Sequence, residues 1–575
     1  MHLDSLLPIE LKGVPLGTPF FMESTFRKRS CVMFRCSPIP AGLSFVAFLL
    51  AASMINHGLV NSNLPAGPGL TLDESFNIDQ GVYLADAFAQ HGPLLFTPDV
   101  ARAVFGSPRY LPDHPPLGRF ILGVSHSLTS TFITGSEETI YNVPAARLGS
   151  CAAFGLTVLL LSEFSLRKYG LTTGLLVAAM LTGMPHLMGH ARLAALESCT
   201  NLAWVAAMIP LLTWWTRPTA PSTMQAAVSG VFWGLLLLTK VQGIFLPVLL
   251  FLWSVAQFRG TSIRPLTVFG IVGAIIFFVG WPWLWLDPVK NVMTYLGRTT
   301  ERQTLYCWYF GQRFSDKEVP WHFPFITTLI TLPVWTLSGL ILRSFRAALD
   351  STEKLLLLFV LMPLTVFAVP GVPVYDGTRL FLIVMPPLAM LAARGFSLWL
   401  DGRQGTNPAT ATSGGARHLG RKVLVGILIG CVPLYWTMQP LAISQYGPLA
   451  GGNRGADRLG MEAGYWSDAL NSEFWTQVPE NSVVYVAPVS HQFQLSDLES
   501  LVPIVQHRGI KLVPWEYDPA RQRGLLLLIH RLADLRSSLR AVPTGAKVIA
   551  DRSRDGVTMA RLIDTTDAVF PELVQ

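Results

Sequence analysis

Long apolar runs recur along this 575-residue chain, and they constrain its fold more than any other feature of the sequence. A helix needs roughly twenty apolar residues to cross the hydrocarbon core of a bilayer. We therefore predict a mainly α-helical fold, a polytopic transmembrane bundle of about eleven spans. The candidate spans lie near residues 41–60, 146–166, 171–190, 196–216, 226–240, 243–258, 265–286, 322–343, 354–370, 378–400 and 421–440, and those at 226–258 have the least distinct boundaries.

The distribution of basic residues predicts the direction of these spans. Lys and Arg gather in every second loop, at 167–168, 217, 259–264, 343–354 and 403–422. Basic loops stay on the cytoplasmic side of a membrane. We therefore expect an integral protein of the cytoplasmic (inner) membrane with its N-terminus inside and its C-terminus outside. The same pattern accounts for the net charge of +7, so nucleic acid is not an expected partner.

The remaining segments define three predicted domains. Residues 1–40 form a cytoplasmic tail, 41–440 the membrane domain with an outer loop at 61–142, and 445–575 a small extracytoplasmic α/β domain. In the outer loop, 74–90 and 115–128 have the pattern of amphipathic surface helices. In the last domain we expect strands at 483–487, 511–514, 525–530, 547–551 and 557–563, and a helix at 531–540. The Gly- and Thr-rich stretch 401–420 is typical of a flexible linker.

An adjacent pair of carboxylates, Asp73 and Glu74, follows the first span on the outer side. A carboxylate beside a bilayer can act as a general base, because partial burial raises its pKa towards the working pH. Acidic residues also stabilise the first turn of a helix by capping its free amides and by interacting with the helix dipole, which is a purely structural role. The local sequence supports both interpretations equally.

A proline-rich turn, PDHPPLGR at 112–119, holds a second group of polar side chains. Its prolines restrict the backbone and would fix Asp113, His114 and Arg119 in place. The alternative is a rigid turn with solvated charges.

Two histidines, His186 and His190, stand four residues apart near the outer end of the third span. Histidines at this spacing can share a metal ion. Position 187 is Leu, so the Glu of the zinc-protease motif is absent, and two histidines without a metal are the favoured interpretation. Glu197 follows, and an acid at such a depth usually has a functional placement.

Two further basic residues lie at the outer ends of spans. Lys240 lies between two spans, and Arg379 closes the sequence YDGTR at 375–379, which also contains Asp376. A guanidinium can hold a phosphate through two hydrogen bonds. Basic side chains at span ends also extend to lipid headgroups without any further role.

In the order of these motifs, the chain resembles a bacterial member of the C-type fold membrane glycosyltransferases, the superfamily of protein O-mannosyltransferases and aminoarabinose transferases. The resemblance covers roughly 41–470. It rests on the Asp73-Glu74 pair, HPPLGR (114–119), Arg147, HARLAALES (190–198), LTK (238–240), YDGTRLFLIVMPPLAML (375–391) and GGNRGADRLGMEAGYW (451–466). The chain departs from the family pattern at Ser75-Phe76-Asn77, and it has Glu rather than Asp at 197.

The resemblance implies transfer of a sugar, with inversion, from a polyprenyl-phosphate donor to an acceptor on the outer face of the membrane. Asp73, with Glu74, would be the catalytic base, and Arg379, Lys240 and Arg119 would hold the donor phosphate. Other substrate contacts would come from Asp113, His114, Arg147, His190, Glu197 and Asp376. The acceptor (glycan, lipid or protein) stays open, as does a divalent metal at His190 and Glu197. Membrane lipids are the remaining expected partners.

Two other classes of function remain as alternatives. A lipid or polysaccharide transporter or flippase would place ionisable residues near the middle of its spans and break its helices there. In this sequence the acids and bases lie mostly at the outer ends. A non-catalytic assembly factor would use the outer domain for binding alone.

Overall fold

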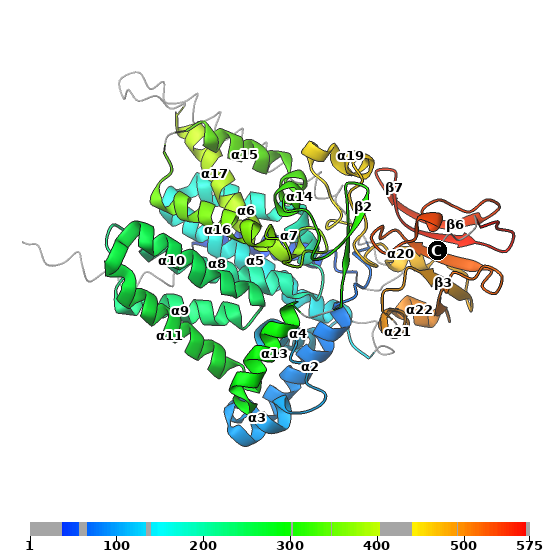
Figure 1. Ribbon diagram of the computed structural model, residues 1–575, viewed down its shortest axis with the longest axis horizontal. Coiled ribbons are helices and arrows are strands. Elements are labelled where there is room, and N and C mark those ends of the chain that lie inside the picture. Colours follow the sequence, from blue (N-terminus) through cyan, green and yellow to red (C-terminus); the bar gives the residue numbers. More distant parts are fainter. Residues whose placement is uncertain are drawn as a thin grey trace, which may run out of the picture.

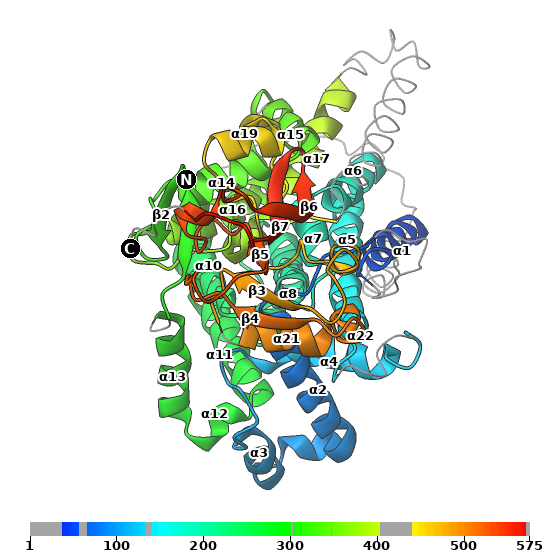
Figure 2. The same cartoon turned by 90° about the vertical axis from the view of Figure 1, so that its right-hand side faces the viewer.

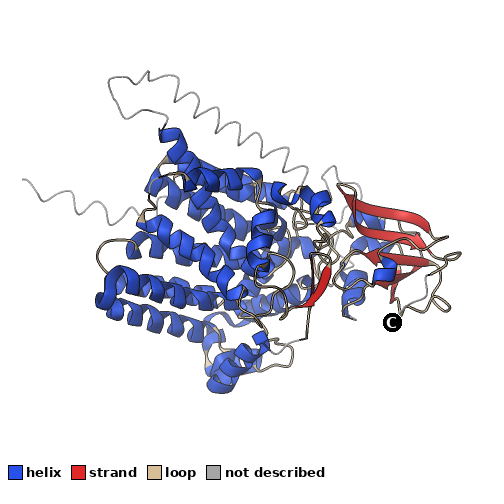
Figure 3. Cartoon of the chain, turned by 45° about the horizontal axis from the view of Figure 1, so that its top comes forward, coloured by secondary structure: helices blue, strands red, loops and turns tan. Residues whose placement is uncertain are grey.

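The computed structural model describes residues 37–56, 66–133, 140–300, 303–346, 348–402, 440–491 and 493–570. Helices form a large bundle, and a small β-sheet lies at one end of it (Figures 1 and 3). The predicted combination of a mainly helical fold with a small α/β domain is thereby confirmed. The predicted cytoplasmic tail, linker and last span, 421–440, lie wholly or almost wholly outside the described residues.

The bundle contains a helix at each of the other ten predicted span positions. They are α1 (Pro38–Ala52), α5 (Val143–Tyr169), α6 (Leu171–Thr182) with α7 (Pro185–His190), α8 (Leu196–Pro210), α9 (Thr223–Leu237), α10 (Phe245–Phe258), α11 (Ile263–Gly280), α14 (Phe323–Thr331) with α15 (Val334–Ser344), α16 (Ser351–Phe367) and α17 (Met385–Gly402). Short 3-10 or π segments extend three of them: η2 (Leu211–Trp215), η3 (Val241–Ile244) and η5 (Arg379–Val384).

The number of described helices that are long and apolar enough to cross a membrane is smaller than the number of predicted spans. The described residues contain four: Val143–Tyr169, Leu196–Trp215, Val241–Gly280 and Arg379–Leu400. The pair α14 and α15, bent by 110°, would be a fifth. Proline explains two of the interruptions, since Pro185 and Pro333 cannot continue the preceding helix. The predicted number of eleven spans is not confirmed.

The two helices predicted in the loop 61–142 are present as α2 (Glu74–His91) and α4 (Pro116–Thr129), and the loop contains a further helix, α3 (Pro98–Phe105). These helices gather at one corner of the bundle with α12 (Trp283–Leu286) and α13 (Pro288–Thr300) (Figures 1 and 2). Helices α2 and α4 approach closely through glycines: a Cβ on Gly123 would lie 1.9 Å from the carbonyl oxygen of Gly81. This crossing brings the start of α4 beside the start of α2.

The outer domain is a five-stranded mixed sheet in the order β4-β3-β5-β7-β6, which Figure 2 shows across the end of the bundle. The strands are β3 (Val483–Ala487), β4 (Lys511–Pro514), β5 (Leu525–Ile529), β6 (Lys547–Arg554) and β7 (Val557–Asp564). β3 pairs in parallel with β4 and β5, and β7 pairs antiparallel with β5 and β6. Short helices α20 (Ser472–Trp475), α21 (Phe493–Leu501) and α22 (Pro503–His507) complete the core. All five predicted strands are confirmed.

The predicted helix at 531–540 is wrong. The segment forms turns and a single 3-10 turn, Ser537–Leu539. Arg531 and Asp534 close the first turn, with Nε of Arg531 donating to Asp534 Oδ2 at 2.6 Å. The backbone N–H groups of Asp534 and Leu535 also donate to the Arg531 carbonyl. These hydrogen bonds form a single turn, which does not continue into a helix.

A β-hairpin joins the bundle to the outer domain. Its strands β1 (Tyr306–Tyr309) and β2 (Gln312–Ser315) are antiparallel and lie between the two parts (Figure 1). Arg313 Nε donates to the carbonyl of Ala533 at 2.6 Å, and Gly311 N–H donates to the carbonyl of Gly460. These hydrogen bonds attach the α/β domain to the hairpin and so to the helical bundle.

Candidate active site

A cavity of about 210 Å³ lies where the outer helix ends, the first outer loop and the outer domain meet. It is lined by Leu72, Asp73, Phe76, Asn77, Asp113, His114, Arg119, Leu196, Lys240, Leu305, Tyr375, Asp376, Arg379, Trp466 and His491. Seven of the eleven residues selected from the sequence are among them: Asp73, Asp113, His114, Arg119, Lys240, Asp376 and Arg379. The chain thus brings together charged groups from segments far apart in sequence.

Arg379 lies at the centre of this cluster and donates to three carboxylates. Its Nε donates to Glu197 Oε1 at 2.8 Å, its Nη1 to Asp376 Oδ2 at 3.0 Å, and its Nη2 to Asp73 Oδ2. The side chains of Glu197 and Asp376 are 2% and 0% exposed, whereas that of Asp73 is 43% exposed. Asp73 is therefore the one of these three carboxylates that a substrate can reach.

Lys240 adds a second cation on the same buried carboxylate. Its Nζ lies 2.7 Å from Glu197 Oε1, the atom that also accepts from Arg379. Lys240 occupies the break between α9 and η3, where the backbone is extended and the side chain turns into the cavity. Glu197 therefore holds two cations side by side without lining the cavity itself.

The proline-rich turn carries a second ion pair. Arg119 donates to both oxygens of Asp113, at 2.5 and 2.9 Å, and its Nε donates to Asn77 Oδ1 at 3.2 Å. Burial alone would raise the pKa of Asp113, but protonated His114 and Arg119 outweigh it and lower that pKa. Burial lowers the pKa of His114 to about 4, so its imidazole is charged in the acid range where Asp113 titrates and neutral at pH 7.

Glu74 and Arg147 lie outside the cavity, in a buried ion pair of their own. Arg147 donates to the two oxygens of Glu74 at 2.8 and 2.7 Å, and their side chains are 2% and 0% exposed. Glu74 also accepts from the backbone N–H groups of Thr71 and Ala194. This pair ties α5 to the turn that precedes Asp73.

The two histidines also lie away from the cavity lining. His186 contacts the Thr378 hydroxyl at 2.8 Å and the Gln445 carbonyl at 2.9 Å, so its ring nitrogens are occupied. His190 is buried with its ring edge-on to Tyr465. No group of three or more His, Cys, Asp or Glu side chains that could hold a metal occurs among the described residues. A metal at His190 and Glu197 stays a prediction.

Several residues of the cavity were not selected from the sequence. Asn77 had a usable signal, because it stands four residues after Asp73 on the same face of α2. Trp466 is the last residue of the motif at 451–466, to which no role was assigned, and nothing in the local sequence marks His491. Asp376 has a positive φ of 56°, a conformation that non-glycine residues adopt mainly where the surrounding structure holds them.

The chain is similar to one protein family model and to several solved structures. The family model described as Dolichyl-phosphate-mannose-protein mannosyltransferase matches residues 106–292. Among solved structures, ArnT from Cupriavidus metallidurans is similar at 13% identity in its apo state, covering 93% of this chain and 98% of that chain with a TM-score of 0.49. Its form bound to undecaprenyl phosphate is similar at 14% identity, covering 91% and 97%, also with a TM-score of 0.49.

The Archaeoglobus fulgidus oligosaccharyltransferase, in complex with Zn and sulfate, is similar at 11% identity, covering 82% of this chain and 62% of that chain with a TM-score of 0.40. No curated protein matches the chain significantly. The segment matched by the family model carries Asp113, Arg119, Arg147, Glu197 and Lys240. The match to the mannosyltransferase family model confirms the predicted resemblance over residues 106–292.

Proposed function

We propose that this protein transfers a sugar from a polyprenyl-phosphate donor to an acceptor on the outer face of the membrane. The observation that carries the proposal is the ion pair between Asp73, a partly exposed carboxylate, and Arg379 in a cavity that Lys240 also lines. A base and a pair of cations side by side suit an acid-base step beside a phosphate. The family match supports a glycosyl transfer rather than transport.

The reaction follows from this placement as a single displacement. Asp73 takes the proton from a hydroxyl or amine of the acceptor molecule. The oxygen or nitrogen of that hydroxyl or amine then forms a bond to the anomeric carbon of the sugar. The bond between that carbon and the phosphate oxygen breaks, and its electron pair stays on the phosphate. Arg379 and Lys240 stabilise the charge that develops there. Attack opposite the leaving group inverts the anomeric configuration.

Arrival of the donor would prepare the base. Arg379 donates to three carboxylates, and a phosphate entering the cavity competes for these donors. Asp73 is the exposed partner, so it is the one that the phosphate displaces. Released from the guanidinium, the Asp73 carboxylate is free to accept a hydrogen bond from the acceptor hydroxyl or amine.

The buried pairs lead to narrower roles for two residues. Glu74 is fully buried against Arg147, so we assign the proton transfer to Asp73 alone. Arg119 is held by Asp113 and Asn77, so we assign it the support of the proline-rich turn and of that wall of the cavity.

The distribution of Lys and Arg in the loops supports a position of this cavity on the outer side of the membrane. With basic loops on the cytoplasmic side, the ends of α8, α9 and η5 that carry Glu197, Lys240 and Arg379 face outwards. The outer domain then covers the cavity on the non-cytoplasmic side. A lipid-linked donor can enter this site from the outer leaflet.

Replacement of the base tests the proposal. We expect Asp73→Asn to lower transfer of a labelled sugar from a polyprenyl-phosphate donor by at least about 100-fold, the usual effect of losing a general base. The matched control is Asp86→Asn, the same change at an exposed position of the same helix. Normal transfer by the Asp73 variant, at equal expression, would overturn the assignment.

A further inference from the structure

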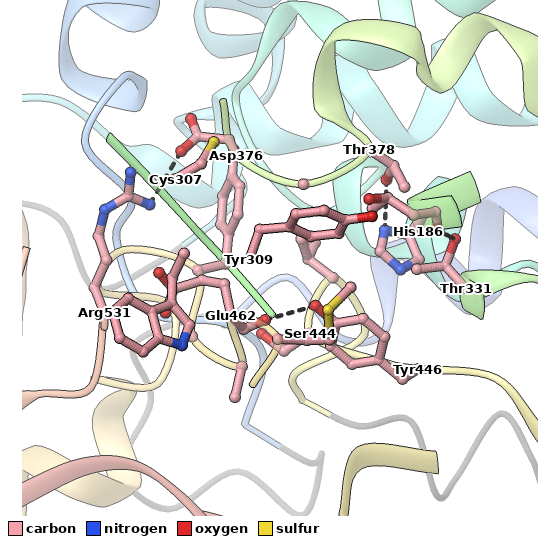
Figure 4. A pocket seen from close by; sticks show the side chains of 18 of the residues that line it. His186, Cys307, Tyr309, Thr331, Asp376, Thr378, Ser444, Tyr446, Glu462 and Arg531 are labelled. Atoms are coloured by element: carbon pink, nitrogen blue, oxygen red, sulfur yellow. Dashed lines mark hydrogen bonds and ion pairs between the residues drawn. The ribbon is translucent and has the colours of Figure 1, made fainter. Parts of the chain in front are cut away.

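A basic residue of the outer domain reaches the cluster around Arg379. Arg531 follows strand β5, and its Nη1 lies 3.0 Å from Asp376 Oδ1. Figure 4 shows this ion pair at the edge of a second pocket, which Cys307, Tyr309 and Glu462 also line. The side chains of Arg531 and Asp376 are 4% and 0% exposed. The contact is therefore buried between the two parts of the molecule.

Asp376 connects Arg531 to the proposed phosphate-binding residue. Its other oxygen, Oδ2, accepts from Arg379 Nη1 at 3.0 Å and from Trp466 Nε1 at 3.2 Å. The guanidinium of Arg531 also lies over the Trp466 ring, 3.7 Å from its centroid. Charges of opposite sign thus alternate from Arg531 through Asp376 and Arg379 to Asp73.

The α/β domain supplies one of the cations that pair with the carboxylates around Arg379, and that cation, Arg531, also pairs with Asp534. Three carboxylates, those of Asp73, Glu197 and Asp376, surround Arg379. Among the ion pairs that the described residues form with them, the membrane bundle supplies two cations, Arg379 and Lys240. Arg531 is the third. Without Arg531, Arg379 would be the one cation of these ion pairs left to hold the Asp376 carboxylate, beside the place where an anionic phosphate must bind.

The loop that carries Arg531 is fixed from several sides. The carboxylate of Glu462 accepts from the backbone N–H groups of Leu532 and Ala533 at 2.7 and 2.9 Å. Arg313 of the hairpin donates to the Ala533 carbonyl, and Asp534 accepts from Arg531 itself. These hydrogen bonds hold the loop in place and so fix the Arg531 side chain beside Asp376.

We propose that Arg531 is a positioning residue of the active site, which neutralises Asp376 and so leaves Arg379 available to the donor phosphate. The inference rests on the proposed function. It makes the outer domain a part of the phosphate-binding site rather than an appended module.

Binding of polyprenyl phosphate without sugar, to the purified full-length protein, tests the inference without depending on turnover. We expect Arg531→Met to weaken this binding roughly tenfold or more, because the Asp376 carboxylate, no longer shared with Arg531, then competes more strongly with the phosphate for Arg379. Adding Asp376→Asn should restore binding to within about threefold of wild type, because the competing carboxylate is then gone. Arg552→Met, which breaks an exposed pair with Glu473, is the matched control and should bind normally.

Each outcome is decisive. Wild-type affinity in the Arg531→Met variant, or weak binding that Asp376→Asn does not restore, would overturn the role of Arg531 and leave the proposed function standing. If Arg531→Met fails to fold, Arg531→Lys provides the same comparison, with near-normal binding expected and a full loss of binding contradicting a role based on charge. A wild-type protein that binds no polyprenyl phosphate would instead refute the proposed function.

Discussion

At the scale of single residues, Asp73 and Glu74 are consecutive and have opposite surroundings. Asp73 lies in the cavity with its side chain 43% exposed, whereas the Glu74 side chain is fully buried on Arg147. Successive side chains at a helix start point about 100° apart, so a pair of acids cannot share one environment there. The sequence could identify the pair as important but could not divide a chemical role from a structural one.

Because Asp73 is partly exposed and Glu74 is fully buried, we expect different consequences when each carboxylate is replaced by its amide. Glu74→Gln leaves the Arg147 guanidinium buried without its counter-charge, which typically costs about 3–5 kcal/mol. We expect the purified variant to unfold at a clearly lower temperature than wild type, whereas Asp73→Asn should unfold within a few degrees of it. Thermal unfolding in detergent checks both. A Glu74→Gln protein as stable as wild type but inactive in transfer would place Glu74 in the chemistry instead.

At the scale of secondary-structure elements, the cavity depends on how α2 and α4 cross. Periodicity and proline positions predicted both helices, because each signal is local. The crossing itself was not predictable, since it requires two glycines 42 positions apart to face each other, Gly81 and Gly123. Helix α2 carries Asp73 at its N-cap position and Asn77 in its second turn, while α4 carries Arg119. The glycines thus set the distance across one wall of the cavity.

A methyl group at this crossing should therefore damage the site. In Gly123→Ala the new Cβ would lie 1.9 Å from the Gly81 carbonyl oxygen, so α4 must move and take Arg119 with it. We expect a loss of stability of about 1–3 kcal/mol, as for other overpacked contacts, and a reduced rate of sugar transfer. The control is Gly270→Ala, a helical glycine with no atom within 4 Å of its added Cβ. Equal behaviour of the two variants would argue against the importance of the crossing.

At the scale of the whole molecule, the cavity joins segments that only the fold brings together. Asp73 and Arg379 are 306 positions apart and form an ion pair. Charge alternation predicted that the acids and bases would share the outer face, because that pattern depends on a property of the bilayer. The contribution of Trp466, His491 and Arg531 could not be predicted, since the packing of the outer domain has no counterpart in local patterns. The number of membrane spans could also not be predicted from the sequence, because bent and short helices interrupt the apolar runs.

A structure of this protein with bound polyprenyl phosphate would test the roles proposed for Asp73, Lys240 and Arg379. We expect the phosphate within hydrogen-bond distance, about 3 Å, of both Lys240 Nζ and the Arg379 guanidinium. We also expect that the Asp73 carboxylate has left Arg379 and faces the open side of the cavity, while Asp376 remains between Arg379 and Arg531. A phosphate bound away from Lys240 and Arg379, or an Asp73 carboxylate still paired with Arg379 beside a bound phosphate, would refute these roles.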